Sequence, residues 1–214
     1  MKYYSQLGQD KFVDDFLNQK ENGIFIDVGA YDGSKFSNTK FFEESRNWSG
    51  ICIEPGPNEF SKLNSTRKSI NINACISDYN GESEFTYLQG YSNALSGLTE
   101  CYDKRHIERI EKEIATYGGE KSLIRTPVIT LEAVLDMHNI HDVDFCSIDT
   151  EGAELNVLKS INFKKVNINI LIVENNYQKN DARNYLRDKG YSHQYLYING
   201  KITWDDIFIK NNYY

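Results

Sequence analysis

The sequence has 214 residues, of which 40% are hydrophobic and 26% are charged, and it carries a net charge of −7 at neutral pH. This composition is ordinary for a globular protein large enough to bury a core, so we expect a single domain over residues 1–214. The acidic balance argues against a nucleic-acid partner bound through a broad basic surface. No apolar run is long enough to span a membrane and the first ten residues are not a signal peptide, so we expect a cytoplasmic protein.

The cysteines and histidines form no disulfide or zinc pattern. Cys52, Cys75, Cys101 and Cys146 stand far apart without a CxxC pair, and three of them fall within apolar runs that predict buried strands. We therefore expect reduced, buried thiols. The four histidines lack the HxxxH or HxH spacing of a zinc site, so zinc binding is not expected.

The first elements of the chain surround one apolar run. Residues 8–19 place apolar side chains at helical spacing, which predicts a short amphipathic helix. Residues 24–28 read IFIDV and are apolar except for Asp27, which is typical of a strand buried on both faces. A helix is predicted over residues 35–46, after a turn rich in small residues.

The turn after this strand favours a bound ligand. Gly29, Ala30, Asp32 and Gly33 allow backbone N–H groups to approach a ligand closely. The spacing matches neither GxGxxG, the dinucleotide pattern, nor GxxxxGK[ST], the nucleoside triphosphate pattern. The carboxylates of Asp27 and Asp32 repel phosphate and suit a cationic ligand, and S-adenosylmethionine carries an ammonium and a sulfonium but no phosphate. A plain strand-to-helix turn with a capping Asp is the alternative.

The remainder of the chain alternates strands with helices. Such alternation predicts an α/β fold with a mostly parallel sheet and helices on both faces. Residues 90–125 interrupt it, so we expect a lid or an acceptor-binding insertion there. Strands are predicted at 50–53, 70–76, 84–87, 126–129, 143–148, 168–173, 193–198 and 204–209, with a turn at 199–200. Helices are predicted at 57–67, 102–117, 131–138 and 180–189, and a further helix follows Glu154 and runs to about Lys159.

Acidic side chains gather at the predicted carboxyl ends of the strands, where ligands bind in open α/β sheets. Glu54 comes about 20 residues after Gly33, the position at which an acid accepts both ribose hydroxyls of an adenosine cofactor. It could instead be an exposed acid at a helix entry. Asp149, Glu151 and Glu174 follow two later strands, where they could stabilise helix N-termini or bind Mg²⁺ or Ca²⁺. A divalent metal is an alternative that we do not predict.

Four segments resemble one known family. FIDVGAYDG, CIEPGPNEF, ACISDYNGE and SIDTEGAE, in this order, are similar to motifs of the FkbM family of S-adenosylmethionine-dependent methyltransferases. YSQLGQD near the start and WDDIFI near the end extend the resemblance to residues 3–209. The resemblance implies a class I methyltransferase (Rossmann-like) fold with seven strands, the last of them inserted antiparallel. Thr150 stands where a variant of the family has Val, a difference that should matter little.

The resemblance also implies where the cofactor binds. S-adenosyl-L-methionine is the implied methyl donor, and S-adenosylhomocysteine is its product. The positions that match the family's cofactor site run from the first strand to the IDTEGAE segment. They are Asp27, Gly29, Ala30, Asp32 and Gly33 at the methionine end, Glu54 and Pro55 at the ribose, Cys75, Ile76 and Ser77 at the adenine, and Asp149 near the methyl group.

The implied reaction is methyl transfer to oxygen, commonly to a hydroxyl of a sugar or of a polyketide-derived product. We expect a sugar hydroxyl in a glycan or glycoconjugate, so the acceptor is a small molecule or an oligosaccharide. A hydroxyl needs a base to remove its proton. The candidates are Asp149 and Glu151, then Glu174, then His106 and His193, with Tyr91, Ser96, His106 and Arg109 as acceptor contacts.

Several other functions stay open. The same acids could serve a metal-assisted methyltransferase, or the acceptor could be a hydroxyl of a natural product other than a sugar. The chain could also be a non-catalytic module that binds an adenosine ligand. Finally, it could be one domain of a larger glycan-modifying protein.

Overall fold

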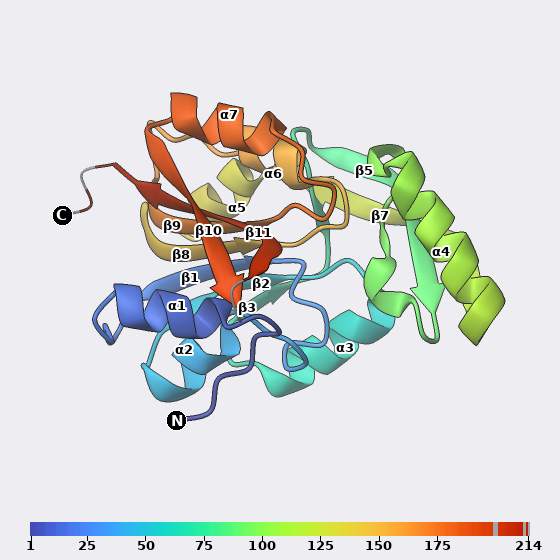
Figure 1. Ribbon diagram of the computed structural model, residues 1–214, viewed down its shortest axis with the longest axis horizontal. Coiled ribbons are helices and arrows are strands. Elements are labelled where there is room, and N and C mark those ends of the chain that lie inside the picture. Colours follow the sequence, from blue (N-terminus) through green and yellow to red (C-terminus); the bar gives the residue numbers. More distant parts are fainter. Residues whose placement is uncertain (199–200, 212, 214) are drawn as a thin grey trace.

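The computed structural model describes residues 1–198, 201–211 and 213. Figure 1 shows a central sheet with helices on both sides, and a smaller sheet with one helix at one end of the molecule. The turn predicted at 199–200 lies outside the described residues. Among the helices that the structure describes, none is both long enough and apolar enough to cross a membrane.

The central sheet has seven strands, with β1 (Ile24–Val28) in its middle. Its order is β10-β11-β9-β8-β1-β2-β3, and the strands from β9 to β3 run parallel. β11 lies between β9 and β10 and is antiparallel to both. This arrangement confirms the predicted mostly parallel sheet with an antiparallel last strand. The other strands are β2 (Ser49–Ile53), β3 (Ile70–Ile72), β8 (Asp142–Ile148), β9 (Asn167–Glu174), β10 (Tyr191–Ile198) and β11 (Lys201–Lys210).

Helices cover both faces of this sheet (Figure 1). Phe25 of β1 packs in a hydrophobic cluster with side chains of the first three helices, whereas Ile26 packs in a second cluster with side chains of three later helices. Successive residues of β1 therefore both meet apolar neighbours, which explains why the strand shows no polar alternation. The first group comprises α1 (Gln9–Phe16), α2 (Lys40–Ser45) and α3 (Pro57–Thr66), and the second α5 (Leu131–Met137), α6 (Glu154–Lys159) and α7 (Asp181–Asp188).

The helix predicted over residues 35–46 begins only at Lys40. The Asp32 side chain accepts hydrogen bonds from the backbone N–H groups of Ser34 and Lys35, and Ser37 Oγ accepts from Lys40 N. Such local bonds between side chain and backbone offer the chain an alternative to helix. The prediction was wrong at this end because it followed apolar spacing and overlooked these capping side chains.

The strand predicted over residues 70–76 is divided between two sheets. β3 ends at Ile72, and β4 (Cys75–Ile76) belongs to a smaller four-stranded sheet of order β4-β7-β5-β6. Between them, Asn73 Nδ2 donates to the backbone oxygens of Glu54 and Pro55. One apolar run therefore crosses from the central sheet to the small sheet, which periodicity alone did not reveal.

The small sheet combines strands that lie outside the predicted insertion at residues 90–125 with strands that lie within it. β5 (Gly81–Gln89) and β7 (Glu120–Ile129) pair antiparallel over their length and extend well beyond the predicted strands 84–87 and 126–129. Their extra residues are largely polar and exposed, so they lack the apolar pattern of a buried strand. Between them lie η1 (Asn93–Leu95), β6 (Gly97–Leu98), η2 (Thr99–Cys101) and α4 (Lys104–Tyr117).

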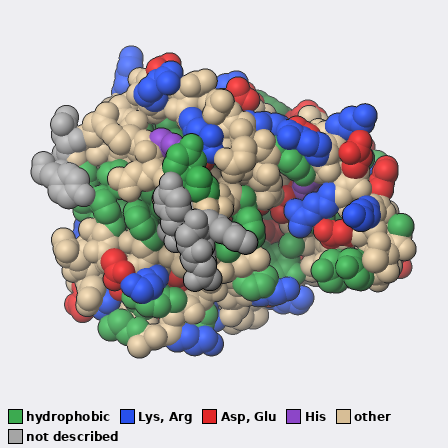
Figure 2. All heavy atoms as spheres, viewed as in Figure 1, with side chains coloured by type: hydrophobic (Ala, Val, Ile, Leu, Met, Phe, Trp, Pro, Cys, Tyr) green, Lys and Arg blue, Asp and Glu red, His purple; other side chains and the backbone are tan. Residues whose placement is uncertain are grey.

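The surface shows no single field of positive charge on the face seen in Figure 2, where Lys and Arg side chains alternate with acidic ones. The four cysteines are free, and Cys52, Cys75 and Cys146 are buried. Both findings agree with the expectations from the sequence.

A buried ion pair ties the N-terminal helix to the rest of the fold. Arg46, just after α2, donates through Nε and Nη2 to the two carboxylate oxygens of Asp14 in α1, at 2.7 and 2.9 Å. The side chains of Arg46 and Asp14 are only 6% and 1% exposed. Bidentate pairs of this kind are strong and directional, but the loss of one partner leaves a buried charge uncompensated.

Replacing Asp14 with Asn should therefore lower the free energy of unfolding by about 3–5 kcal/mol. Urea denaturation followed by circular dichroism measures this difference. Asp15→Asn is the matched control, because the Asp15 side chain is 56% exposed and forms an exposed ion pair with Lys11. A loss for Asp14→Asn that is no larger than the loss for Asp15→Asn would show that the buried pair does not anchor α1.

Candidate active site

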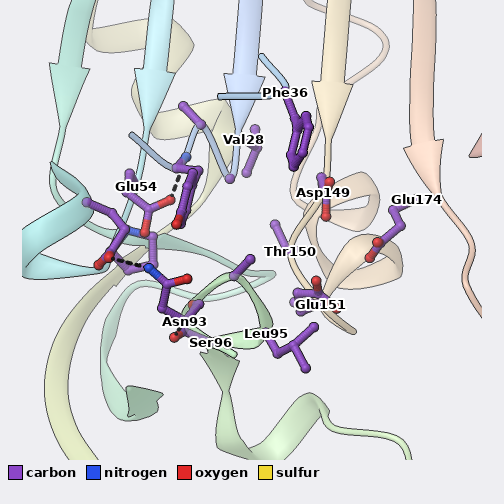
Figure 3. Close-up of a pocket in the computed structure, with 18 of the residues that line it drawn as sticks. Val28, Phe36, Glu54, Asn93, Leu95, Ser96, Asp149, Thr150, Glu151 and Glu174 are labelled. Carbon is purple, nitrogen blue, oxygen red and sulfur yellow. Dashed lines mark hydrogen bonds between the residues drawn. The ribbon is translucent and has the colours of Figure 1, made fainter. Parts of the chain in front are cut away.

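A cavity of about 950 Å³ opens at the carboxyl ends of β1, β2, β8 and β9. Residues 90–98 and Arg109 of the insertion close it on the far side. In Figure 3, Glu54 and Asn93 lie on one side of the cavity, and Asp149, Glu151 and Glu174 lie on the other. The cavity therefore has two ends, which differ in their chemistry.

The turn after β1 forms the floor between these ends. Gly29 has φ +86°, and a Cβ atom there would lie 1.7 Å from the backbone oxygen of Asp149. No residue with a side chain fits, so glycine is what allows the ends of β1 and β8 to approach. Tyr31 follows with φ +50°. Its backbone N–H points at Glu54, where it donates to Oε2 at 2.9 Å.

Glu54 is held by two backbone groups. Its Oε2 accepts from Tyr31 N, and its Oε1 accepts from Gly56 N at 2.7 Å. Burial nevertheless raises the pKa of the Glu54 carboxyl to about 7, against the opposing effect of these two bonds. Each oxygen keeps a further lone pair that could accept a donor from a ligand in the cavity.

Asp27 and Asn38 occupy the middle of the cavity wall. Asp27 Oδ2 accepts from Thr39 Oγ1 at 2.6 Å, and burial raises the Asp27 pKa despite the nearby charge of Arg67. Asn38 Nδ2 donates to Ser147 Oγ, whereas Asn38 Oδ1 is buried and has no hydrogen-bond partner among the described residues. A buried acceptor of this kind calls for a donor from a ligand or from water.

Three carboxylates meet at the other end of the cavity. Asp149, Glu151 and Glu174 each place one oxygen so that all three lie within 4.8 Å of one another. Burial is the main cause that raises the pKa of all three, and repulsion by neighbouring carboxylates adds to it, although a hydrogen bond with Glu174 opposes the rise for Asp149. They come from the ends of neighbouring parallel strands, so the fold itself brings them together.

The 149–154 segment is shaped to present Glu151. Glu151 has φ +57°, a conformation unusual for a residue other than glycine. Glu154 Oε1 stabilises the turn by accepting from Thr150 N, Thr150 Oγ1 and Gly152 N. The strained backbone is thus held by a network of bonds, as is common at functional sites.

His106 lies behind Glu151 and does not line the cavity. Its side chain is 1% exposed, its Nε2 lies 3.1 Å from the backbone oxygen of Leu95, and its Nδ1 lies 3.4 Å from Glu151 Oε2. Burial lowers the pKa of His106. His106 can therefore act on a ligand only through Glu151, as a positioning residue.

The predicted site residues divide into two groups. Asp32, Gly33 and Ser77 do not line the cavity: Asp32 caps the following turn, and a Cβ at Gly33 would meet the side chains of Leu63 and Arg67. His193 also lies elsewhere and pairs with Asp206 at 2.8 Å. The predicted residues that do line it are Asp27, Gly29, Ala30, Glu54, Pro55, Cys75, Ile76, Asp149, Glu151 and Glu174, and with them Tyr91, Ser96 and Arg109.

Several other lining residues could not be identified from sequence patterns. Glu59 accepts from Asn93 Nδ2 at 3.1 Å, which links α3 to the insertion across the cavity. On the sequence Glu59 looks like an ordinary helix acid, and Asn93 lies in a stretch of loop residues. Asn38 falls within the helix predicted over residues 35–46, so the sequence does not mark it as a lining residue. The one available signal is Asp32, a residue type that caps turns and so delays the start of the helix.

The charge of the lining is strongly one-sided. Among the described residues that line the cavity, eight are Asp or Glu and two are Lys or Arg, namely Lys35 and Arg109. Arg109 Nε is already bound to Glu113. An anionic ligand would be repelled here, whereas a ligand with one or two positive centres would be attracted.

The sheet with its antiparallel last strand and the ligand cavity at the strand ends define a class I methyltransferase fold. More narrowly, the chain belongs to the FkbM methyltransferase family, because the methyltransferase FkbM domain matches residues 27–193. No curated protein gives a significant match to the sequence.

One solved structure of an FkbM methyltransferase has the same fold. Methyltransferase FkbM from Methylobacillus flagellatus KT is 13% identical with a TM-score of 0.53, and the match covers 88% of this chain and 43% of that one. The chain thus spans less than half the length of that relative. Precorrin-6y C5,15-methyltransferase from Geobacter metallireducens GS-15 is 10% identical with a TM-score of 0.45, over 94% of this chain and 85% of that one.

The raised pKa of Glu54 makes stability depend on pH. The folded state binds a proton at Glu54 up to about pH 7, whereas the ordinary value for Glu is 4.5. The resulting stabilisation is complete below pH 4.5 and is lost as the pH rises to about 7, with a slope of at most about 1.4 kcal/mol per pH unit.

Urea unfolding of the wild type and of Glu54→Gln should therefore diverge between pH 4.5 and pH 7. The wild type should lose stability with rising pH more steeply than the variant, because Gln cannot bind the proton. Glu82→Gln, at an exposed acid in β5, should run parallel to the wild type. Parallel curves for Glu54→Gln would mean that Glu54 is ionised across this range in the folded protein.

Proposed function

We propose that the protein transfers a methyl group from S-adenosylmethionine to a hydroxyl oxygen of a sugar, within a glycan or glycoconjugate. The observation that carries the proposal is the acid-lined cavity at the carboxyl ends of β1, β2, β8 and β9 in a chain of the FkbM family. Eight acids against two bases disfavour a phosphate-bearing cofactor and favour a cationic one. S-adenosylmethionine carries a sulfonium and an ammonium and has no phosphate.

The residues present fit this cofactor. Glu54 has free lone pairs on both oxygens, which suit the two ribose hydroxyls. The apolar residues Cys75 and Ile76 line the wall beside it and suit the adenine ring. Asp27 and the unpartnered Asn38 Oδ1 suit the ammonium group. We therefore assign the cofactor to the Glu54 side of the cavity in Figure 3.

The acceptor then belongs to the side with Asp149, Glu151 and Glu174. When bound, S-adenosylmethionine supplies an electrophilic methyl group, and transfer forms a carbon–oxygen bond as the carbon–sulfur bond breaks. The chain contributes by holding the acceptor oxygen in line and by taking up the hydroxyl proton. Asp149 and Glu151 face the cavity and are the residues to which we assign this role.

Exposed aromatic rings at the cavity mouth support a sugar as acceptor. Tyr91 lines the cavity and packs against Tyr117, with ring centroids 4.1 Å apart and ring planes tilted by 31°. Both side chains are largely exposed, so together they offer an aromatic surface to solvent. Such a surface can stack against the C–H face of a sugar ring while the hydroxyls stay in contact with polar groups.

Because the small sheet shares a hydrophobic cluster with Ala153, we also propose that residues 1–214 form one domain.

Calorimetric titration with S-adenosylhomocysteine should show micromolar binding, and NAD should not bind, because its two phosphates would enter an acidic cavity. Glu54→Ala should weaken this binding by about tenfold or more, since two ribose hydroxyls lose their acceptor. Glu82→Ala is the control, because Glu82 lies in β5 and does not line the cavity. Unchanged binding for Glu54→Ala would remove the ribose assignment, and binding of neither ligand would favour a different ligand or a non-catalytic module.

Turnover can be followed as S-adenosylhomocysteine released in the presence of a panel of deoxy-sugars and oligosaccharides. Asp149→Asn or Glu151→Gln should reduce the rate by about 10²–10⁴-fold while binding of S-adenosylhomocysteine persists, because these side chains serve the acceptor. Glu111→Gln, on an exposed position of α4, should keep the parental rate. Full activity in both active-site variants would contradict the assignment of the acceptor base.

A further inference from the structure

We propose that Asp149, Glu151 and Glu174 form a binding site for one divalent cation with a preference for oxygen ligands, such as Mn²⁺, Mg²⁺ or Ca²⁺. The three carboxylates belong to two adjacent parallel strand ends, β8 and β9, and to the turn that follows β8. All three line the cavity, so a cation from solvent can reach them. Figure 3 shows the three side chains turned toward the same side of the cavity.

The spacing of the oxygens suits a single ion. One oxygen from each residue lies within 4.8 Å of the other two. Mg²⁺ binds oxygen at about 2.0–2.1 Å and Ca²⁺ at about 2.3–2.6 Å, so two ligands on opposite sides of an ion stand about 4–5 Å apart. The three oxygens can therefore contact one ion with little or no movement of the backbone.

The ligands are positioned by bonds that leave oxygens free. Glu174 Oε1 accepts from Asn176 Nδ2 at 2.7 Å, which orients the carboxylate through one oxygen only. Glu151 is presented by its left-handed backbone, and Gly152 behind it has no room for a side chain, since a Cβ would lie 2.7 Å from the backbone oxygen of Cys101. The insertion therefore fixes the turn that carries the second ligand.

His106 and Glu151 place two buried acceptor atoms face to face beside this cluster. Its Nε2 faces the carbonyl oxygen of Leu95, so Nε2 carries the hydrogen and Nδ1 of the neutral ring is a bare acceptor. That acceptor faces another, Glu151 Oε2, at 3.4 Å. Within the described part of the chain, neither atom has a hydrogen-bond partner. Two buried acceptors in this position require a positive charge or a shared proton near them.

The chemistry of the ligands selects the type of cation. Carboxylate oxygens are hard ligands, which suit Mg²⁺, Mn²⁺ and Ca²⁺, and the cluster contains no thiolate. The one cationic side chain that lines this end, Arg109, is already paired with Glu113. A divalent ion would therefore add to the partial compensation that Arg109 gives Glu151, and would offset the charge of the three neighbouring carboxylates.

Metal binding at this site does not depend on methyl transfer and can be measured without cofactor or acceptor. Chelator-treated protein is titrated with MnCl₂, and free Mn²⁺ is followed by electron paramagnetic resonance. We expect one Mn²⁺ per chain, displaced by excess Mg²⁺ or Ca²⁺. Absence of saturable binding below about 1 mM, the range of weak natural sites, would overturn the proposal and leave a shared proton between His106 and Glu151.

Variants locate the ion. Glu174→Gln should weaken Mn²⁺ binding by more than about tenfold, because loss of even an outer partner of a metal site typically costs that much. Glu59→Gln is the matched control: it removes one negative charge from the opposite end of the cavity and should leave the affinity within about threefold. Equal loss in both variants would mean that Mn²⁺ responds only to the overall charge of the cavity, which would also overturn the proposal.

A folding defect must not be mistaken for lost binding. Thermal unfolding of each variant without metal provides this check, and Asp149→Asn replaces Glu174→Gln if the latter does not fold. Calorimetric binding of S-adenosylhomocysteine to the chelator-treated wild type separates this inference from the proposed function. Failure of Mn²⁺ binding with intact cofactor binding would sink the metal site alone.

Discussion

The close approach of the β1 and β8 ends at Gly29 is the constraint on which the site depends. Gly29 N and Ala30 N both donate to the backbone oxygen of Ile53, while Asp149 N donates to Val28 O. These bonds join the carboxyl ends of β1, β2 and β8. At this point a Cβ atom on Gly29 would overlap the backbone of Asp149. Because the join is made by backbone atoms, the side chains of Asp27, Glu54 and Asp149 are all free to line one cavity.

The cavity also withdraws several carboxylates from water. Burying a carboxylate is unfavourable unless a partner compensates for it. At one end of the cavity, Glu54 and Asp27 obtain part of that compensation from backbone N–H groups and from Thr39. At the other end, the carboxylates of Asp149, Glu151 and Glu174 have fewer internal donors among the described residues. A cavity built in this way is least stable when empty, so ligands with positive charge should stabilise the fold as they bind.

The sequence predicted the central sheet well because each of its strands is a short apolar run bounded by turn residues. The acids at the strand ends could be predicted for the same reason, since a parallel sheet places all its carboxyl ends together. Two kinds of feature escaped. Side-chain capping by Asp32 and Ser37 replaced one turn of predicted helix, because local polar bonds leave no apolar period. The lengths of β5 and β7 were underestimated, because backbone pairing between exposed polar residues leaves no pattern in a single sequence. For the same reason, the hydrogen bond from Asn93 to Glu59 could not be predicted.

The crossing of residues 70–76 between the two sheets couples the two ends of the cavity. β4 is hydrogen-bonded to β7 of the small sheet, and its residues Cys75 and Ile76 form part of the cavity wall. The small sheet, whose insertion closes the far side of the cavity, is therefore continuous with the wall formed by Cys75 and Ile76. A shift of the small sheet changes both ends at once, and the energetic coupling between their occupants is equal in either direction. Occupation of one end should therefore change the affinity of the other end by a factor that does not depend on which ligand binds first.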